Sequence, residues 1–255
     1  AFIVAVVVIA FKKKRSIGNY ERNTEMYKLL IGSEGSFYDS ERYFRGGISD
    51  STEMNSENTT GKTLISLHKV YPQSFVKPTM KEALIMAKLA EEQTSDVVKA
   101  CKNSAEFVKA DGKLFEGFTE EDAAAIAMYT YDFGPEEFES NPYRIINRSL
   151  VGRNYAGLQR ASGILYLVMT ALRKLPRVTG QTLYRGVRSE VNMDKGHYHE
   201  GNTITWPALS STSPDMKATK TFLAKEAKNK KAKGTLFIIE DGWGYNIQPY
   251  SLFPG

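Results

Sequence analysis

The spacing of apolar residues changes at Pro176, and this change limits the folds that the chain can adopt. Between Pro78 and Leu175 apolar residues recur at helical spacing, whereas the later segments are short and rich in β-branched and aromatic residues. Strands are expected over 182–187, 203–209 and 234–239, with one helix between them over 216–228. Helices followed by strands are typical of α+β proteins, so we predict an N-terminal helical lobe followed by a β-rich core.

Capping signals place several helix boundaries in the first part of the chain. Thr79 followed by Glu82 forms a capping box, and Thr119 precedes acidic residues that stabilise the first turn of a helix. A strongly amphipathic helix is expected over 158–175, where Pro176 ends it. Further helices are expected over 21–30 and 96–108.

The first eleven residues are all apolar, and four basic residues, Lys12 to Arg15, follow at once. A membrane-spanning helix needs about 20 apolar residues. We therefore interpret residues 1–15 as the end of a transmembrane helix with its basic cytoplasmic flank. A buried β-strand over Ile3–Ile9 is the alternative, because valine and isoleucine favour strands.

This interpretation divides the chain into a membrane end, a juxtamembrane segment with a linker over 16–77, and a domain over 78–255. It makes the protein membrane-anchored, with the domain in the cytoplasm. Two N-x-S/T sequons, at Asn58 and Asn147, favour the alternative, an extracellular or secreted location.

Charge and metal-ligand content exclude several classes of function. The net charge of +5 falls to 30 − 29 = +1 without the basic run at 12–15, so we expect no nucleic-acid partner. Cys101 is the only cysteine, which excludes an intramolecular disulfide framework. The spacing of His197 and His199 would place both imidazoles on one side of a strand, but two ligands are too few for a zinc site, so we expect a solvated hairpin and no metal.

Three segments of the β-rich part carry residues suited to a phosphate-bearing ligand. Tyr184-Arg185-Gly186 offers a guanidinium beside a glycine, which combines a planar donor group with close access to the backbone. Ser211-Thr212-Ser213 places three hydroxyls after a strand. The third segment is the strand 234–239 with Glu240, followed by a loop rich in glycine and aromatic residues over 241–255.

In this order the three segments resemble the ADP-ribosyltransferases of the arginine–serine–glutamate class. That family carries an aromatic-Arg-Gly run, then Ser-Thr-Ser, then a Glu-x-Glu after a loop that recognises the target. The resemblance covers residues 78–255, with the helical lobe at 78–176 and the NAD-binding β core at 180–255. It implies an enzyme of the glycosyltransferase class, a mono-ADP-ribosyltransferase that uses NAD as a substrate.

The resemblance also implies roles for single residues. Arg185 would bind a phosphate of NAD, and the backbone of Gly186 would hold the nicotinamide amide. Ser211 would orient the catalytic glutamate, while Thr212 and Ser213 brace the strand. Four aromatic residues would belong to the target-recognition loop or, alternatively, pack against the sheet: Trp243, Tyr245, Tyr250 and Phe253.

The family's Glu-x-Glu is the one motif that this sequence lacks. The last residues are Ser251 to Gly255, about where the motif begins in the family, and Glu240 lies before the loop. We therefore expect a domain that is incomplete at its C-terminal end and a chain that is inactive or nearly so by itself. The implied function is NAD-dependent mono-ADP-ribosylation of a protein, with arginine favoured and nicotinamide released. The alternative is a non-catalytic, membrane-tethered pseudoenzyme that binds NAD or a partner.

Overall fold

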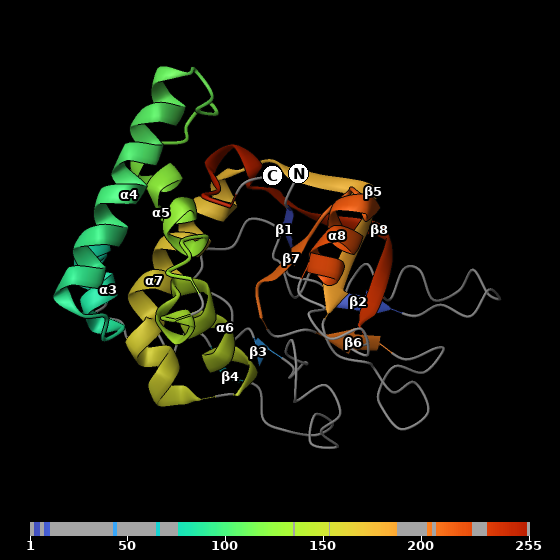
Figure 1. Cartoon of the computed structure of the whole chain (residues 1–255), viewed down its shortest axis with the longest axis horizontal. Helices are drawn as coiled ribbons and strands as arrows, with labels where there is room; N and C mark the ends of the chain where they lie inside the picture. Colours follow the sequence, from blue (N-terminus) through green and yellow to red (C-terminus); the bar gives the residue numbers. More distant parts are fainter. Residues whose placement is uncertain are drawn as a thin grey trace.

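The computed structural model describes residues 3–5, 8–10, 43–44, 65–66, 76–134, 136–152, 154–187, 203–205, 208–225 and 234–253. Within these residues a layer of helices lies beside a small antiparallel sheet (Figure 1). The helices precede the main strands along the chain. The predicted α+β class, with a helical lobe followed by a β-rich core, is confirmed.

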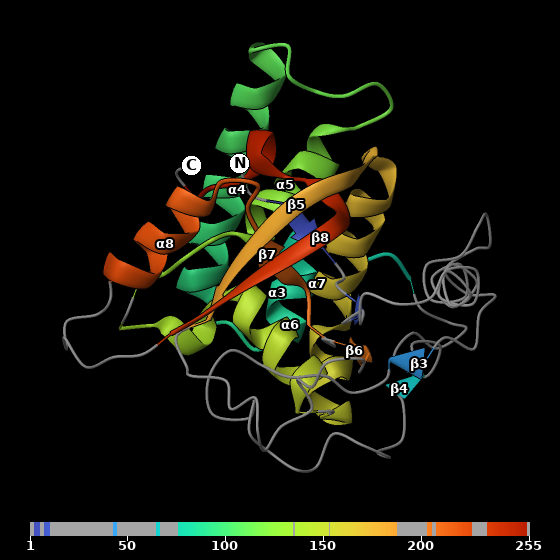
Figure 2. The same ribbon diagram turned by 90° about the vertical axis from the view of Figure 1, so that its right-hand side faces the viewer.

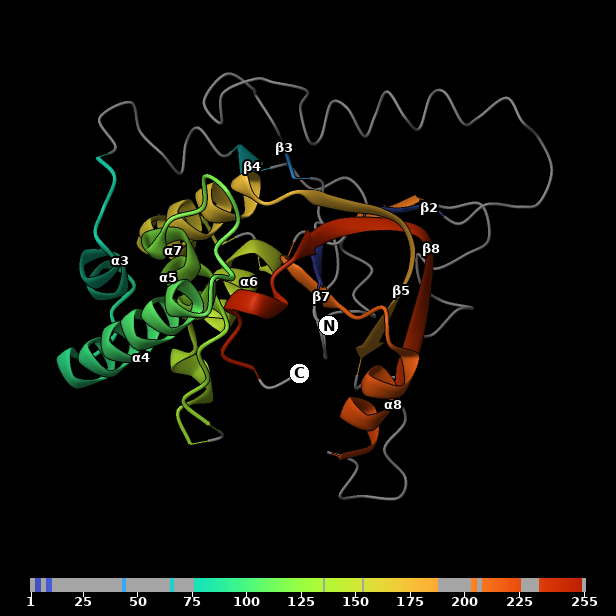
Figure 3. The ribbon, with the colours of Figure 1, turned by 90° about the horizontal axis from the view of Figure 1, so that it is seen from above.

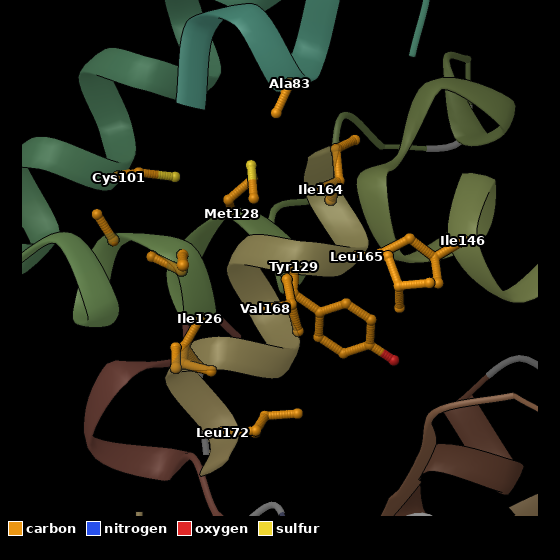
Figure 4. Close-up of a cluster of buried hydrophobic side chains, with 14 of the residues drawn as sticks. Ala83, Cys101, Ile126, Met128, Tyr129, Ile146, Ile164, Leu165, Val168 and Leu172 are labelled. Atoms are coloured by element: carbon orange, nitrogen blue, oxygen red, sulfur yellow. The ribbon is translucent and has the colours of Figure 1, made fainter. Parts of the chain in front are cut away.

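The helical lobe has five α-helices arranged around α7. Their bounds are Met80–Met86 for α3, Glu91–Ala110 for α4, Glu120–Tyr129 for α5, Pro142–Val151 for α6 and Tyr155–Lys174 for α7. Helix α7 packs against α3, α5 and α6, and buried side chains fill the space between them (Figure 4). A short 3-10 helix, η2 (Phe138–Ser140), lies between α5 and α6, and a second, η3 (Gln248–Tyr250), follows β8 (Thr235–Asn246).

The caps read from the sequence start the helices as expected. The hydroxyl of Thr79 accepts from the N–H of Glu82 at 3.3 Å, and that of Thr119 accepts from the N–H of Asp122 at 3.2 Å. Helix α4 begins at Glu91, earlier than the expected residue 96, and Oε1 of Gln93 accepts from the N–H of the N-cap residue Ala90 at 3.1 Å. The helix expected over 21–30 lies outside the described residues.

The main sheet has the strand order β5-β8-β1-β7, and all its pairings are antiparallel (Figure 2). The strands are β5 at Arg177–Val187, β8 at Thr235–Asn246, β1 at Ile3–Ala5 and β7 at Ser210–Thr212. A bridge between Tyr184 and Ser213 also joins the end of β7 to β5. Helix α8 (Met216–Lys225) connects β7 to β8 along the chain and packs against β5.

Strand β8 is longer than the sequence indicated, because residues 241–246 pair with β5 and are not a loop. Gly242 pairs with Gln181, and Gly244 pairs with Val178. The register shifts on both sides of Gln181, and Asp241 has a positive φ of 51°. Such irregularities let the ladder continue through a bend that glycine tolerates.

The strand expected over 203–209 is shorter in the structure. Its first part is β6 (Thr203–Thr205), which pairs with β2 (Val8–Ala10). Ala208 and Leu209 are outside both strands, and β7 begins at Ser210, one residue after the expected end. A further short pair joins β3 (Tyr43–Phe44) to β4 (Ile65–Ser66).

The N-terminal segment differs from the interpretation that we favoured. Residues 3–5 and 8–10 are the strands β1 and β2, as the alternative of a β-strand expected, and not helix. Strand β1 lies between β7 and β8 and pairs with both, so the backbone groups of this apolar segment find partners within the sheet. In the part of the chain that the structure describes, no helix is both long and apolar enough to cross a bilayer. Membrane attachment and the location of the domain stay predictions.

Candidate functional site

Arg185 and Ser211 come together where β5 and β7 approach each other. The half-buried guanidinium of Arg185 donates from Nη1 to the backbone oxygen of Ser211 at 2.9 Å. Two backbone hydrogen bonds between Tyr184 and Ser213, at 2.7 and 2.9 Å, fix the same corner. The structure therefore brings together the two motifs that the sequence analysis singled out, although they are far apart in the chain.

Strand alternation decides which hydroxyls face outward in β7. Ser210, Thr212 and Ser213 are buried, whereas Ser211 is exposed. The hydroxyl of Ser213 accepts from the N–H of Asp215 at 3.0 Å, in the turn that leads into α8. Ser211 is thus the residue of this motif whose side chain a ligand can reach.

Gly186 lies where α8 crosses β5. A Cβ atom at this position would lie 2.8 Å from Cγ of Leu223. This distance is shorter than real Cβ contacts, so a side chain here would force the side chain of Leu223 or the helix to shift. The packing of α8 gives a reason for glycine at 186 that is separate from the ligand contact implied by the resemblance.

Two residues of the helical lobe, Asn147 in α6 and Tyr129 in α5, join it to Leu209, the residue before β7. The side chain of Asn147 in α6 pairs with both backbone groups of Leu209: its Oδ1 accepts from N–H at 3.1 Å and its Nδ2 donates to the carbonyl at 3.2 Å. The buried hydroxyl of Tyr129 in α5 donates to the same carbonyl at 3.2 Å. The sequence analysis missed this contact, because no local pattern links residues 62 positions apart.

In the sequence, Asn147 stands out only as the first residue of an N-x-S/T sequon. Its Nδ2, the atom to which a glycan would attach, donates to Leu209 and to Tyr129 Oη. Glycosylation would replace one of these hydrogens and place a bulky sugar between the helix and β7. The folded domain is therefore incompatible with a glycan at Asn147, and Asn58 lies outside the described residues.

The aromatic residues assigned to target recognition have different environments. Trp243 and Tyr245 lie in β8 and not in a loop, and Tyr245 is 9% exposed. Trp243 is half-buried, with the Arg177 guanidinium 5.4 Å from its ring centre. Phe253 is 40% exposed, and its ring lies 6.5 Å from that of Tyr143.

Tyr250 is the clearest exception to the recognition assignment. It is 4% exposed, its ring lies 4.6 Å from that of Phe118, and its hydroxyl donates to the carbonyl of Lys113 at 3.3 Å. Burial raises the pKa of this phenol. The segment after β8 thus turns back onto the helical lobe (Figure 3), and Tyr250 has the packing role that was the alternative for these residues.

The described residues do not bring three or more histidine, cysteine, aspartate or glutamate side chains into a group that could hold a metal. His197 and His199 lie outside the described ranges. Cys101 is fully buried in α4, and burial raises its thiol pKa to about 12. This thiol is protonated at neutral pH and is therefore a poor nucleophile.

The comparisons with known proteins give one result. A family model described as NAD:arginine ADP-ribosyltransferase matches residues 57–255, more than half of the chain, and includes all of the site above. The match begins before residue 78, where the sequence analysis placed the start of the domain. Neither the curated proteins nor the solved structures gave a match to this chain.

Proposed function

Because the chain belongs to the NAD:arginine ADP-ribosyltransferase family, we propose that its domain binds NAD at the corner of β5 and β7 and transfers ADP-ribose to arginine side chains of a protein. Membership of this family supports NAD-dependent ADP-ribosyl transfer in general. The observation that carries the assignment to this corner is the hydrogen bond from Arg185 to the backbone oxygen of Ser211, which joins the cation to the exposed residue of the Ser-Thr-Ser motif.

The proposed reaction exchanges one glycosidic bond for another. The bond between nicotinamide and C1 of the ribose breaks, a nitrogen of the acceptor guanidinium bonds to C1, and that nitrogen loses a proton. Nicotinamide is released as the leaving group. Positive charge develops on the ribose ring as nicotinamide leaves, and a carboxylate placed beside it lowers the barrier.

The residues of the corner between β5 and β7 are suited to binding NAD. Arg185 presents a planar fork of N–H donors, which matches the oxygens of a phosphate better than a point charge does. Ser211, two residues beyond Leu209, presents its hydroxyl at the exposed side of β7. In our proposal Arg185 holds a phosphate of NAD, the backbone of Gly186 contacts the nicotinamide amide, and Ser211 orients the glutamate, with Thr212 and Ser213 bracing the strand.

The second candidate function is NAD binding or partner binding without turnover. Within the 255 residues no glutamate follows Glu240, so the chain by itself does not supply the family's Glu-x-Glu. For the 255-residue chain by itself we propose NAD binding with little or no release of nicotinamide. Rapid nicotinamide release by the purified chain would contradict this part of the proposal.

Binding of NAD to two arginine variants of the same strand tests the assignment. Arg185→Ala removes the guanidinium at the corner, whereas Arg177→Ala removes one at the other end of β5, beside Trp243. We expect Arg185→Ala to weaken NAD binding about tenfold or more, as the loss of a charge-assisted hydrogen bond predicts, and Arg177→Ala to leave it unchanged. Equal affinity of Arg185→Ala and the unaltered chain, measured by calorimetry, would refute the role of Arg185.

A further inference from the structure

Strand β7 is held along one edge by three contacts from three parts of the molecule. Leu209 pairs with the side chain of Asn147, the carbonyl of Ser211 accepts from Arg185, and Ser213 pairs with the backbone of Tyr184. Leu209, Ser211 and Ser213 alternate along the chain, the first and last of them flanking β7. In the register with β1, Ser210, Ser211 and Thr212 lie opposite Ala5, Val4 and Ile3, and the N–H and C=O groups of Ser210 and Thr212 point to this opposite edge.

The contact with Asn147 takes the place of a strand partner. In an extended strand the N–H and C=O of one residue point to the same edge, and those of the next residue point to the other edge. Strand β5 pairs with Ser213, and the carboxamide of Asn147 supplies the equivalent donor and acceptor for Leu209. The helical lobe therefore completes an edge that β5 begins.

Three polar contacts meet at the carbonyl of Leu209. Nδ2 of Asn147 and Oη of Tyr129 both donate to this oxygen, and Nδ2 also lies 3.3 Å from Tyr129 Oη. The N–H of Leu209 donates to Oδ1 of Asn147. A carbonyl oxygen can accept two hydrogen bonds, so Asn147 and Tyr129 can both donate to Leu209. Removal of Asn147 leaves the N–H of Leu209 without this partner.

We infer that Asn147, assisted by Tyr129, is a positioning residue that fixes the register of β7 and so decides that the hydroxyl of Ser211 faces the NAD site. A shift of one residue would turn every β7 side chain to the opposite face. Ser211 would then point inward, and Ser210 and Thr212 would point outward. The carboxamide can pair with Leu209 or with a residue two positions away, but not with Ser210, because the backbone groups of Ser210 point to the other edge.

This inference rests on the proposed function for its link to NAD, but its structural part does not. The test therefore has two readouts on the full chain: the dissociation constant for NAD, and hydrogen exchange of the backbone amides at 208–213. The second readout reports the order of β7 whether or not NAD binds.

Asn147→Ala and a matched control separate positioning from general stability. The control is Asn154→Ala, which removes the cap that accepts from Gly157 N–H at the start of α7 and does not contact β7. We expect Asn147→Ala to weaken NAD binding about tenfold and to speed exchange at 208–213. We expect Asn154→Ala to lower the unfolding midpoint while leaving both readouts as in the unaltered chain.

Tyr129→Phe provides a milder variant if Asn147→Ala does not fold. It removes the hydroxyl but keeps the pairing of Asn147 with Leu209, so we expect about threefold weaker NAD binding and a smaller rise in exchange at 208–213. If Asn147→Ala folds, or Tyr129→Phe in its place, unchanged exchange at 208–213 in that variant would overturn the inference.

The outcomes distinguish this inference from the proposed function. If the unaltered chain binds no NAD, the proposed function fails, and exchange at 208–213 alone decides whether Asn147 positions β7. If the chain binds NAD and Asn147→Ala binds it equally well, the positioning role is refuted and the proposed function stands.

Discussion

Arg185 donates a hydrogen bond from Nη1 to the backbone oxygen of Ser211 at 2.9 Å, and this contact joins β5 to β7 across 26 residues of sequence. The acceptor belongs to the residue of the Ser-Thr-Ser motif that is exposed, so the guanidinium and Ser211 lie at the same corner.

Gly186→Ala is expected to destabilise the protein by about 1–3 kcal/mol, the usual cost of overpacking. The added methyl group would lie 2.8 Å from Cγ and 3.0 Å from Cδ2 of Leu223. Urea unfolding measures the loss. A stability equal to that of the unaltered protein would show that the Leu223 side chain or α8 can move aside.

The double variant Gly186→Ala/Leu223→Ala separates the packing role of Gly186 from a role at the ligand. Removing the bulk of Leu223 relieves the clash, so we expect the double variant to bind NAD no worse than Leu223→Ala alone if packing is the only reason for the glycine. NAD binding that is weaker in the double variant than in Leu223→Ala would assign the glycine a ligand contact as well.

The ion pair between Asp122 and Lys174 predicts acid sensitivity of the helical lobe. Burial by itself would raise the pKa of Asp122, but the 2.7 Å contact with Lys174 and the hydrogen bonds from Thr119 outweigh it and lower the pKa. A carboxyl with a lowered pKa in the folded state stabilises the protein above its unfolded pKa. That contribution is lost as the pH falls through the folded pKa.

Asp122→Asn tests this origin of the acid sensitivity. At pH 7 we expect a loss of about 1–3 kcal/mol in the free energy of unfolding, because the partly buried hydrogen bond from the charged Lys174 to Asp122 is weakened. The loss should shrink as the pH is lowered into the acid range. Glu121→Gln is the control: its pair with Lys77 is exposed on both sides and should contribute less than about 1 kcal/mol. An equal pH dependence of Asp122→Asn and the unaltered protein would contradict the assignment.

Cys101 is expected to resist thiol reagents in the folded protein. Its side chain is fully buried, and burial raises its pKa to about 12, so very little thiolate is present at neutral pH. Iodoacetamide should label it only after urea unfolding, as followed by mass spectrometry. Labelling of the native protein at the rate of a free thiol would show that α4 opens readily.

Tyr250 is expected to stabilise the fold and Phe253 to contribute little. Tyr250→Ala removes a buried ring that packs on Phe118, and large-to-small changes of buried aromatic residues cost about 3–5 kcal/mol. Phe253→Ala removes a ring that is 40% exposed, and its cost should be well below that. Similar unfolding midpoints for the two variants would contradict the docking of this segment on the helical lobe.

Local signals in the sequence predicted the local features of the fold. The caps at Thr79 and Thr119, the end of α7 before Pro176 and the order of helices and strands all depend on residues close together in the chain. The resemblance that linked Arg185 to Ser211 drew on the order of motifs, and the structure brings these two residues into contact.

The remaining features depend on pairing between distant segments, which no single stretch of sequence encodes. The apolar residues of β1 suit either a membrane helix or a strand, and only the edges of β7 and β8 decide between them. The length of β8 depends on a bulged register with β5, and the contact of Asn147 depends on where Leu209 lies after folding. These cases show why site residues can be recognised while the residues that support them are missed.

Hydrogen exchange of the 255-residue chain with and without NAD tests the central claim most directly. If NAD binds at the corner of Arg185 and Ser211, exchange should slow in the peptides that cover 182–187 and 209–213, while α4, on the far side of the helical lobe, should show no change. Binding of NAD with protection elsewhere, and none in these two segments, would contradict the account.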